Sequence, residues 1–226
     1  MRIKTAVIGC GGISTWHLAG WIRIPEVTIV ALCDLDRNAA EARRQAYAPE
    51  ARVYTSIEAL LASESIDLLD VVTPPALHTE HCLAAARAGV HIVCQKPLCD
   101  TLSAARALVA ALADYPRRCG VHENHRYRPW FRTVLARHAA AAFGTLQSIH
   151  LLQHDPEPPP EPFKRQAAHG VLLEYGVHLV DLTRALLGDP QAVSARIHRL
   201  NPAVHGDSLA HVTLHYGGAT ALIDIA

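Results

Sequence analysis

Short β-branched apolar runs alternate with Ala- and Leu-rich amphipathic stretches through the first half of the chain. The runs are brief and nearly continuous, which predicts buried strands. These strands cover residues 3–9, 27–34, 51–55, 67–74, 90–95 and 118–121. The stretches between them predict helices over residues 14–21, 37–46, 57–62, 79–88 and 102–113. Strands separated by helices indicate an α/β fold, a doubly wound parallel sheet with helices on both faces.

The pattern changes beyond Arg126, where the alternation of strand and helix becomes irregular. This part is predicted to contain helices over residues 130–142 and 170–187, and strands over 145–153, 191–200, 208–215 and 219–225. A proline-rich stretch, residues 154–166, lies between them. Such stretches are extended and seldom hold a core, so we expect this one to act as a lid or a partner contact.

Composition narrows the class of protein. Half of the 226 residues are hydrophobic, and 21 basic residues balance 21 acidic ones, which argues against a nucleic-acid partner. No apolar run approaches the roughly 18 residues of a membrane span. The N-terminus leads from basic residues directly into a strand, without the pattern of a signal peptide. We therefore expect a cytoplasmic protein with no membrane partner.

Neither the cysteines nor the histidines show a metal-binding spacing. The six cysteines contain no Cys-x-x-Cys pair, which argues against a disulfide framework or a zinc site. The densest histidine group, residues 122–125, lacks the two histidines four positions apart that a helical metal site requires. We expect no metal.

Ligands of doubly wound sheets bind at the carboxyl ends of the strands, so the residues that follow each strand matter most. After the first strand comes a G-x-G-x-x-S loop that opens a helix: Gly9, Cys10, Gly11, Gly12, Ile13 and Ser14. The first glycine permits a tight turn, and the second lets the backbone approach a pyrophosphate at a helix N-terminus. The loop predicts nucleotide binding; the alternative is an ordinary glycine turn.

Asp34 follows the second strand, about twenty residues beyond the glycine loop. A carboxylate at this place accepts hydrogen bonds from an adenosine ribose and repels a 2′-phosphate. It therefore favours NAD over NADP, although Arg37 is close enough to weaken the preference. The alternative is a helix cap, because Asp34 and Asp36 precede a predicted helix.

Two further strand ends carry candidate residues. Thr73 and Pro74, with His78 shortly after them, either contact a ligand or simply start the next helix. Lys96 follows the fifth strand and is held by Pro97, so that it points in a fixed direction. A cation there polarises a substrate hydroxyl or carbonyl beside a nicotinamide, unless it is a solvated lysine in a turn.

Six motifs in order resemble those of the glucose–fructose oxidoreductase, inositol dehydrogenase and rhizopine-catabolism oxidoreductases. The family has a glycine loop, an Asp after strand two, a Thr-Pro segment, a Glu-Lys-Pro turn, an Asn-x-Arg segment and a Gly-x-His-x-x-Asp helix. The matching residues here are Gly9–Ser14, Asp34, Thr73-Pro74-Pro75 with His78, Gln95-Lys96-Pro97, Asn124-His125-Arg126 and Gly176 to Asp181. The resemblance covers almost the whole chain.

The resemblance implies a dinucleotide-binding Rossmann domain over residues 1–122 and a partial α+β domain, with a mostly antiparallel sheet, over residues 123–226. It implies hydride transfer between NAD or NADP and a sugar, polyol or related small alcohol, with Lys96 in the catalytic pocket. Gln95 stands where relatives usually have Glu, and it cannot neutralise the lysine. The implied cofactor contacts are the glycine loop, Asp34, Thr73, Pro74, His78, Gln95 and Lys96, and the implied substrate contacts are Asn124, His125 and Arg126.

Glu174 and His178 lie four residues apart on one predicted helix, so they share a face. A carboxylate beside an imidazole orients it, as a general base requires. Taken alone, the spacing favours a surface pair. The resemblance instead makes His178 the general base and Glu174 its orienting partner, where relatives commonly have Asp.

The resemblance also implies that relatives are longer, by something on the order of a hundred residues. The second sheet would then have an exposed edge, which favours a homo-oligomer formed through that sheet. Two other functions stay open: a non-catalytic NAD(P)-binding regulator or assembly protein, and NAD-dependent cleavage of a glycosidic bond through transient oxidation.

Overall fold

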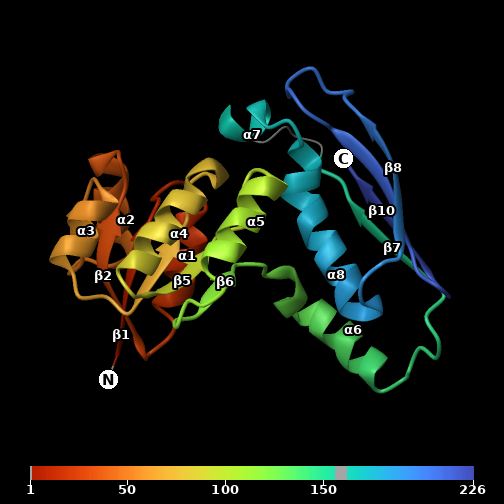
Figure 1. Cartoon of the computed structure of the whole chain (residues 1–226), viewed down its shortest axis with the longest axis horizontal. Coiled ribbons are helices and arrows are strands. Elements are labelled where there is room, and N and C mark those ends of the chain that lie inside the picture. The colour runs from red at the N-terminus through yellow and green to blue at the C-terminus, as the bar shows by residue number, and fades with distance from the viewer. Residues whose placement is uncertain (1, 156–161) are drawn as a thin grey trace. The chain divides into compact units, whose positions relative to one another are not determined.

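The computed structural model describes residues 2–155 and 162–226. The chain forms two compact units, Met1–His122 and Glu123–Ala226, and each is described by itself below. Most of their elements are labelled in Figure 1.

The first unit is built on a six-stranded parallel sheet with the strand order β3-β2-β1-β4-β5-β6. The strands are β1 (Ile3–Ile8), β2 (Val27–Cys33), β3 (Arg52–Tyr54), β4 (Leu68–Val71), β5 (His91–Cys94) and β6 (Cys119–Val121). This is the order of a dinucleotide-binding Rossmann fold, in which the chain reverses direction across the sheet between β1 and β4. The predicted α/β fold is confirmed.

Helices cover both faces of this sheet (Figure 1). They are α1 (Ser14–Trp21), α2 (Arg37–Tyr47), α3 (Ile57–Ser63), α4 (His78–Arg87) and α5 (Leu102–Ala111). Neighbouring residues of a strand point to opposite faces, and β1 therefore serves two cores. Val7 packs with Leu18 of α1 and Ala40 of α2, whereas residues 6 and 8 pack with α3, α4 and α5.

The second unit contains a four-stranded mixed sheet with the order β7-β10-β9-β8. Its strands are β7 (Ser148–Gln153), β8 (Ala192–His198), β9 (Leu209–His215) and β10 (Thr220–Ile225). Only the β7–β10 pair among these strands is parallel, so the described sheet is mostly antiparallel, as expected. One face packs against α6 (Pro129–Ala139) and α8 (Val177–Leu187), around Phe131 and Leu182.

The structure changes two expectations about local conformation. The predicted helix over residues 170–187 contains a π-helical turn, Leu172–Gly176, directly before α8. The proline-rich stretch ends in a short helix, α7 (Pro162–Gln166), rather than in extended chain. The lid or partner contact expected of this stretch falls largely on residues 156–161, which lie outside the described residues.

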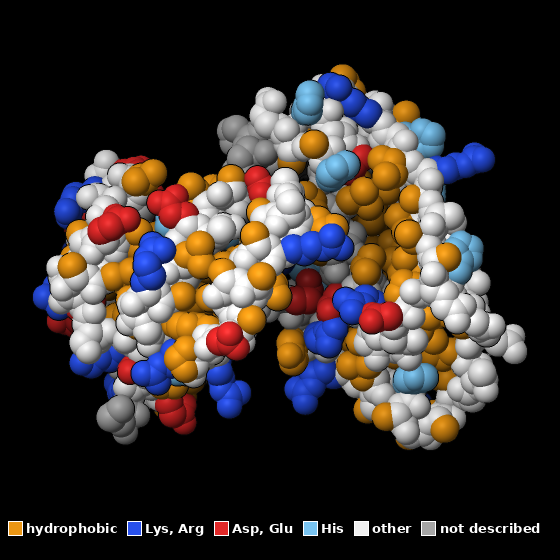
Figure 2. Space-filling view, viewed as in Figure 1, with side chains coloured by type: hydrophobic (Ala, Val, Ile, Leu, Met, Phe, Trp, Pro, Cys, Tyr) orange, Lys and Arg blue, Asp and Glu red, His pale blue; other side chains and the backbone are white. Residues whose placement is uncertain are grey.

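The strand β8 leaves apolar surface uncovered on the second unit. Val193 pairs with Leu214 and Ile197 with Ala210, so these side chains share the face that carries the core. Val193 is nevertheless 64% exposed and Ile197 48% exposed. Figure 2 shows hydrophobic side chains gathered over the sheet of this unit, beside α8. The core of the described residues thus ends before it reaches β8.

Candidate active site

The glycine loop follows β1 at the carboxyl edge of the first sheet. Gly9 has φ +94°, and a Cβ atom there would lie 2.6–2.7 Å from backbone atoms of Val72 and Thr73. No side chain fits at this position, so β1 and the end of β4 approach each other only through glycine. Around Gly11 and Gly12 the space is open, with nothing among the described residues within 4 Å of a Cβ atom.

The loop is held in shape by its own side chains and by α2. Ser14 Oγ donates to the carbonyl oxygen of Gly11 at 2.6 Å, and Arg43 donates to Ser14 Oγ at 3.0 Å and to the same carbonyl at 3.1 Å. Ser14 is fully buried. Residues 11–13 are exposed directly before the first turn of α1, which leaves room for a pyrophosphate at the helix N-terminus.

Asp34 joins the end of β2 to the same loop. Its Oδ2 accepts from the N–H of Cys10 at 2.7 Å, and its Oδ1 accepts from the N–H of Asp36 at 2.9 Å. Asp36, rather than Asp34, caps α2 by accepting from the N–H of Asn38. Each carboxylate oxygen of Asp34 retains a lone pair for a ribose hydroxyl. The guanidinium of Arg37 lies 3.9 Å from the carboxylate of Glu41.

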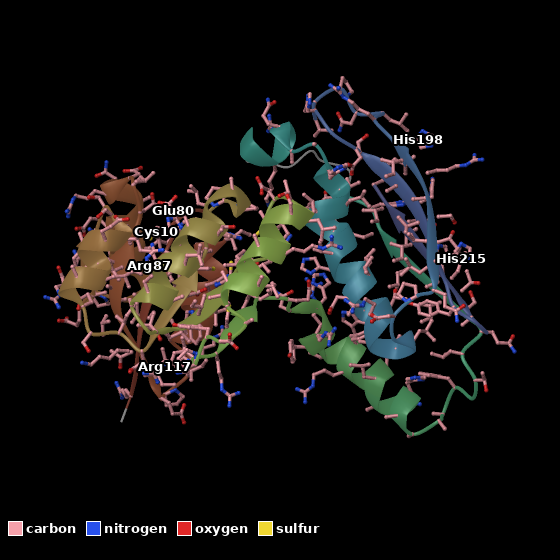
Figure 3. All side chains as sticks on the ribbon, in the orientation of Figure 1. Cys10, Glu80, Arg87, Arg117, His198 and His215 are labelled. Carbon is pink, nitrogen blue, oxygen red and sulfur yellow. The ribbon has the colours of Figure 1, made fainter. Side chains whose placement is uncertain are left out.

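The two cysteines at this edge of the sheet are not candidates for a catalytic nucleophile. Cys10, labelled in Figure 3, is a member of the glycine loop, and its side chain is buried. Burial and the neighbouring Asp34 raise the pKa of its thiol to about 12, and burial raises the pKa of Cys33 to about 12 as well. Both remain protonated at neutral pH and are poor nucleophiles.

His78 requires a correction, because it was expected to contact the cofactor. The structure buries it completely. Its Nε2 lies 2.7 Å from the carbonyl oxygen of Thr73, and its Nδ1 lies 3.0 Å from that of Pro97 and 3.2 Å from that of Leu98. The ring therefore joins the turn after β4 to the turn after β5. It supports the edge of the site and cannot reach a ligand.

Thr73 and Pro74 do lie at the strand end, as expected. Thr73 Oγ1 lies 3.1 Å from Nδ1 of His81, whose pKa is lowered by burial. Pro74 precedes the short helical turn Pro75–Leu77 that leads into α4. Their cofactor contact stays a prediction.

Lys96 sits in the turn after β5, next to a cis peptide bond to Pro97. Its backbone N–H donates to Oε1 of Gln95 at 2.6 Å. Nε2 of the same amide lies 3.1 Å from Nε2 of His17, on α1. Sequence reasoning missed His17 and its partner Asp70, a carboxylate buried in the apolar strand β4. A charged residue inside such a strand is the signal that would have found them.

His178 also requires a correction, because its partner is not Glu174. Nδ1 of His178 lies 2.6 and 2.7 Å from the two carboxylate oxygens of Glu123. Oε1 of Glu174 accepts from Nζ of Lys164 at 3.0 Å. The predicted pairing assumed α-helical geometry, but Glu174 lies in the π-helical turn. Such a turn hydrogen-bonds i to i+5 and so changes which residues share a face.

The Glu123 carboxylate fixes the protonation pattern of the buried His178 ring. A carboxylate only accepts, so Nδ1 carries the proton and Nε2 is left as the basic nitrogen. Burial raises the pKa of Glu123, but hydrogen bonds from His178 and from the N–H of His125 outweigh it and leave the pKa below its usual value. The pair can therefore take a proton at Nε2 while Glu123 stabilises the resulting imidazolium.

The segment that carries Glu123 is anchored to α8. His125 stacks on His178 with ring centroids 3.7 Å apart. Arg126 forms a two-pronged ion pair with Asp181 of α8, one arm at 2.7 Å. The Arg126 guanidinium thus braces the segment, and its expected substrate contact, like those of Asn124 and His125, stays a prediction.

Glu123, His125 and His178 also place three possible metal-ligand atoms within 4.8 Å of one another. Two features disfavour a metal. The imidazole rings are stacked at an interplanar angle of 19°, so their lone pairs lie in two separate, nearly parallel planes, which disfavours convergence on one ion. A metal on Nδ1 of His178 would also displace the proton that Glu123 holds. The geometry is that of an acid–base pair.

A shallow depression of about 720 Å³ runs along α6, between Tyr127 and Ala142. None of the predicted site residues lines it. Its position therefore gives no support for a ligand bound at the predicted site residues.

The comparisons with known proteins identify the family of the chain. A family model described as the oxidoreductase family with an NAD-binding Rossmann fold matches residues 3–123, and the GFO/IDH/MocA C-terminal domain matches residues 131–226. The chain therefore belongs to the GFO/IDH/MocA oxidoreductase family. This confirms the family that the sequence motifs resemble.

Individual relatives extend over nearly the whole chain. A D-apiose dehydrogenase of Paraburkholderia graminis is 34% identical over 226 residues, which are 99% of this chain and 60% of that enzyme. An inositol 2-dehydrogenase of Rhizobium meliloti is 28% identical over 92% of this chain and 62% of its own length. The chain thus spans about 60% of the length of these relatives.

A solved structure of similar fold is an oxidoreductase from Agrobacterium radiobacter in complex with NAD+, L-tartaric acid and magnesium. It is 28% identical, superposes with a TM-score of 0.94, and covers 100% of this chain with 67% of its own. None of the helices in the described part of this chain has the length and hydrophobicity of a membrane span.

Proposed function

We propose that the chain is the cofactor-binding and acid–base part of an NAD-dependent dehydrogenase that acts on a CH–OH group of a sugar or polyol. The observation that carries this proposal is the hydrogen bond between Glu123 and Nδ1 of the buried His178. It leaves a basic Nε2 in a chain whose family uses a nicotinamide cofactor. Oxidation of an alcohol needs a base for the hydroxyl proton and an acceptor for the hydride.

The cofactor proposed is NAD rather than NADP. Gly11 and Gly12 provide open backbone for a pyrophosphate, and Asp34 provides a carboxylate for the ribose at the end of β2. A 2′-phosphate would be repelled by Asp34, and the neighbouring Arg37 is directed toward Glu41. When bound, the nicotinamide accepts or supplies the hydride, and this chemistry is its own.

The residues of the chain handle the proton and the charge on oxygen. Nε2 of His178 takes the hydroxyl proton, and Glu123 stabilises the imidazolium that forms. The ammonium of Lys96 stabilises negative charge that develops on the substrate oxygen. The role of Lys96 follows from its place in the family's Lys-Pro turn.

The substrate class is proposed from the relatives. One acts on D-apiose and another on inositol, by their names, and the two alignments cover 99% and 92% of this chain. A compact polyhydroxylated molecule is therefore the substrate to test first. The identity of the sugar and the direction of the reaction are left to a substrate screen.

Turnover and cofactor binding test the proposal separately. NAD+ reduction is measured with a panel of sugars and inositols, and NADH affinity is measured by fluorescence titration. His178→Asn is expected to lower turnover 10²–10⁴-fold, typical of a lost general base, and to leave NADH affinity nearly unchanged. Equal losses in both would contradict the role of His178. If the chain binds NADH but none of the tested sugars or inositols supports NAD+ reduction, the result would favour a non-catalytic regulator.

We also propose that the second unit forms a homo-oligomer through its sheet. The face opposite the core carries Leu152, 61% exposed, and Leu222, 40% exposed. Polar groups surround them: His150 and His211 both hydrogen-bond to Asp224 at 2.7 Å. Light scattering tests this. Leu152→Asp is expected to reduce the oligomer, whereas Val109→Asp, an equally exposed site on α5, is not.

A further inference from the structure

A chain of hydrogen bonds crosses the carboxyl edge of the first sheet and ends at the turn of Lys96. It begins at Asp70, which is fully buried in β4 and accepts from Trp21 Nε1 at 2.6 Å. His17 Nδ1 lies 2.9 Å from the same carboxylate oxygen, and His17 Nε2 lies 3.1 Å from Nε2 of Gln95. Gln95 Oε1 accepts from the N–H of Lys96 at 2.6 Å.

The donors and acceptors in this series of hydrogen bonds allow one arrangement of protons. The N–H of Lys96 can only donate, so Gln95 must present its oxygen to it and its NH₂ group to His17. An NH₂ group only donates, so Nε2 of His17 must accept. The proton of His17 is therefore on Nδ1, where it donates to Asp70. A flipped amide at Gln95 would face donor with donor at the Lys96 end.

The substitution Gln95→Glu would reverse the direction of the hydrogen bond between residue 95 and His17. The introduced carboxylate accepts from Lys96 and cannot donate to His17, so Nε2 of His17 would need its own proton. Asp70 favours that second proton, because its Oδ1 is buried and has no hydrogen-bond partner among the described residues. The three side chains then carry the same total charge in both cases: Gln, neutral His and Asp⁻ sum to −1, as do Glu⁻, His⁺ and Asp⁻.

We propose that His17 and Asp70 are positioning residues for Lys96, and that His17 sets the charge at this edge by gaining a proton whenever residue 95 is anionic. The proposal rests on the catalytic role proposed for Lys96. The buried pair further links α1, which follows the glycine loop, to the turn of Lys96.

The groups that face His17 in the described part of the chain come from three elements. Asp70 approaches from β4, Gln95 from the turn after β5, and the ring of His122, which follows β6, lies 4.3 Å away between centroids. His17 itself is 5% exposed. The neighbouring hydrogen bonds therefore decide which of its ring nitrogens donates.

Nitrogen NMR of the imidazole rings tests the proposal directly. The ¹⁵N-labelled chain is recorded at neutral pH, and the signals of His17 are assigned by their loss in His17→Asn. The wild type is expected to show a protonated Nδ1 and a bare Nε2. Gln95→Glu is expected to show both nitrogens protonated, and Gln95→Met, which has a similar shape but no charge, to show one proton. A proton on Nε2 in the wild type, or a singly protonated His17 in Gln95→Glu, overturns the proposal.

Turnover separates positioning from mere stability. His17→Asn keeps a donor for Asp70 but loses the contact with Gln95, and it is expected to lower kcat about 10-fold, since misplaced groups cost up to about 10². His17→Gln reaches Gln95 again and is expected to recover part of that loss. Unchanged kcat in His17→Asn contradicts the positioning role. A wild type that fails to bind NADH refutes the proposed function but not the proton arrangement.

Discussion

The glycine loop of the first unit and the His178 pair of the second unit are built in different ways. The loop is recognisable from local sequence, because its glycines lie between β1 and α1, although Gly9 is required because Val72 and Thr73 leave no room for a side chain. His178 depends on Glu123, a residue 55 positions away. A motif read along the chain therefore locates the glycine loop, but it finds only one of the two residues of the His178 pair.

The largest effect is expected from a substitution at Gly9, where the backbone of the glycine loop lies against the backbone of Val72 and Thr73. Gly9→Ala places a Cβ atom 2.6 Å from Val72 and requires positive φ of a residue with a side chain. It is expected to lower the free energy of unfolding by about 3 kcal/mol, within the range of overpacking plus backbone strain. Denaturant unfolding followed by circular dichroism measures it.

Gly11→Ala is the matched control, since a Cβ atom there meets no described atom within 4 Å. Stability is expected to change by less than about 0.5 kcal/mol, while NADH affinity falls because the methyl group occupies the space left for the pyrophosphate. If both variants lost stability equally, the packing account of Gly9 would be wrong.

The next effect concerns cofactor choice. Asp34→Asn keeps an acceptor for the N–H of Cys10 but removes the charge. NADH affinity is expected to fall on the order of 10-fold, because hydrogen bonds to charged groups contribute about 1.5–3 kcal/mol, and the preference over NADPH shrinks with it. Parallel fluorescence titrations measure both. An unchanged ratio would remove Asp34 from the specificity argument.

A smaller effect is expected at the brace between the Glu123 segment and α8. Arg126→Ala removes the ion pair with Asp181 and is expected to lower the free energy of unfolding by about 1 kcal/mol, given the partial exposure of both groups. Arg132→Ala, on the exposed surface of α6, serves as the control. A loss of turnover in Arg126→Ala with no loss of stability would instead support a substrate contact.

The smallest effect is a pH dependence of stability from Glu123. Its pKa in the folded chain is below the ordinary 4.5, so its contribution is fully present above 4.5 and is lost as the pH falls through the folded value. Glu123→Gln is therefore expected to flatten the acid limb of the stability curve below pH 4.5. Urea midpoints measured from about pH 6 to about pH 3 check this, and parallel curves for the two proteins would contradict it.

The sequence predicts most of the fold, because apolar periodicity and glycine positions are local properties. The strands from β1 to β10 fall where the pattern of hydrophobic residues places them. The family resemblance implies a cofactor contact for His78, yet its contacts to Thr73 and Pro97 arise from tertiary packing. Nothing in its neighbourhood along the chain distinguishes the two roles.

The pairing of His178 was mispredicted for a similar physical reason. Glu174 has the right spacing on an ideal α-helix, and no local pattern in the sequence indicates the π-helical turn that contains it. Asp70 could have been recognised, since a buried carboxylate in an apolar strand needs a partner. The partner, His17, lies 53 residues earlier and could only be guessed.

The most direct test of the central claim compares Glu123→Gln with Glu174→Gln, two variants with the same chemical change in the same unit. Turnover of NAD+ with the best sugar or polyol substrate is measured for both, with NADH affinity as a check on folding. The predicted result is a loss on the order of 10²-fold for Glu123→Gln, since the imidazolium loses its counter-charge, and a change of less than about threefold for Glu174→Gln. The reverse order, or equal losses, would show that Glu123 does not orient the base.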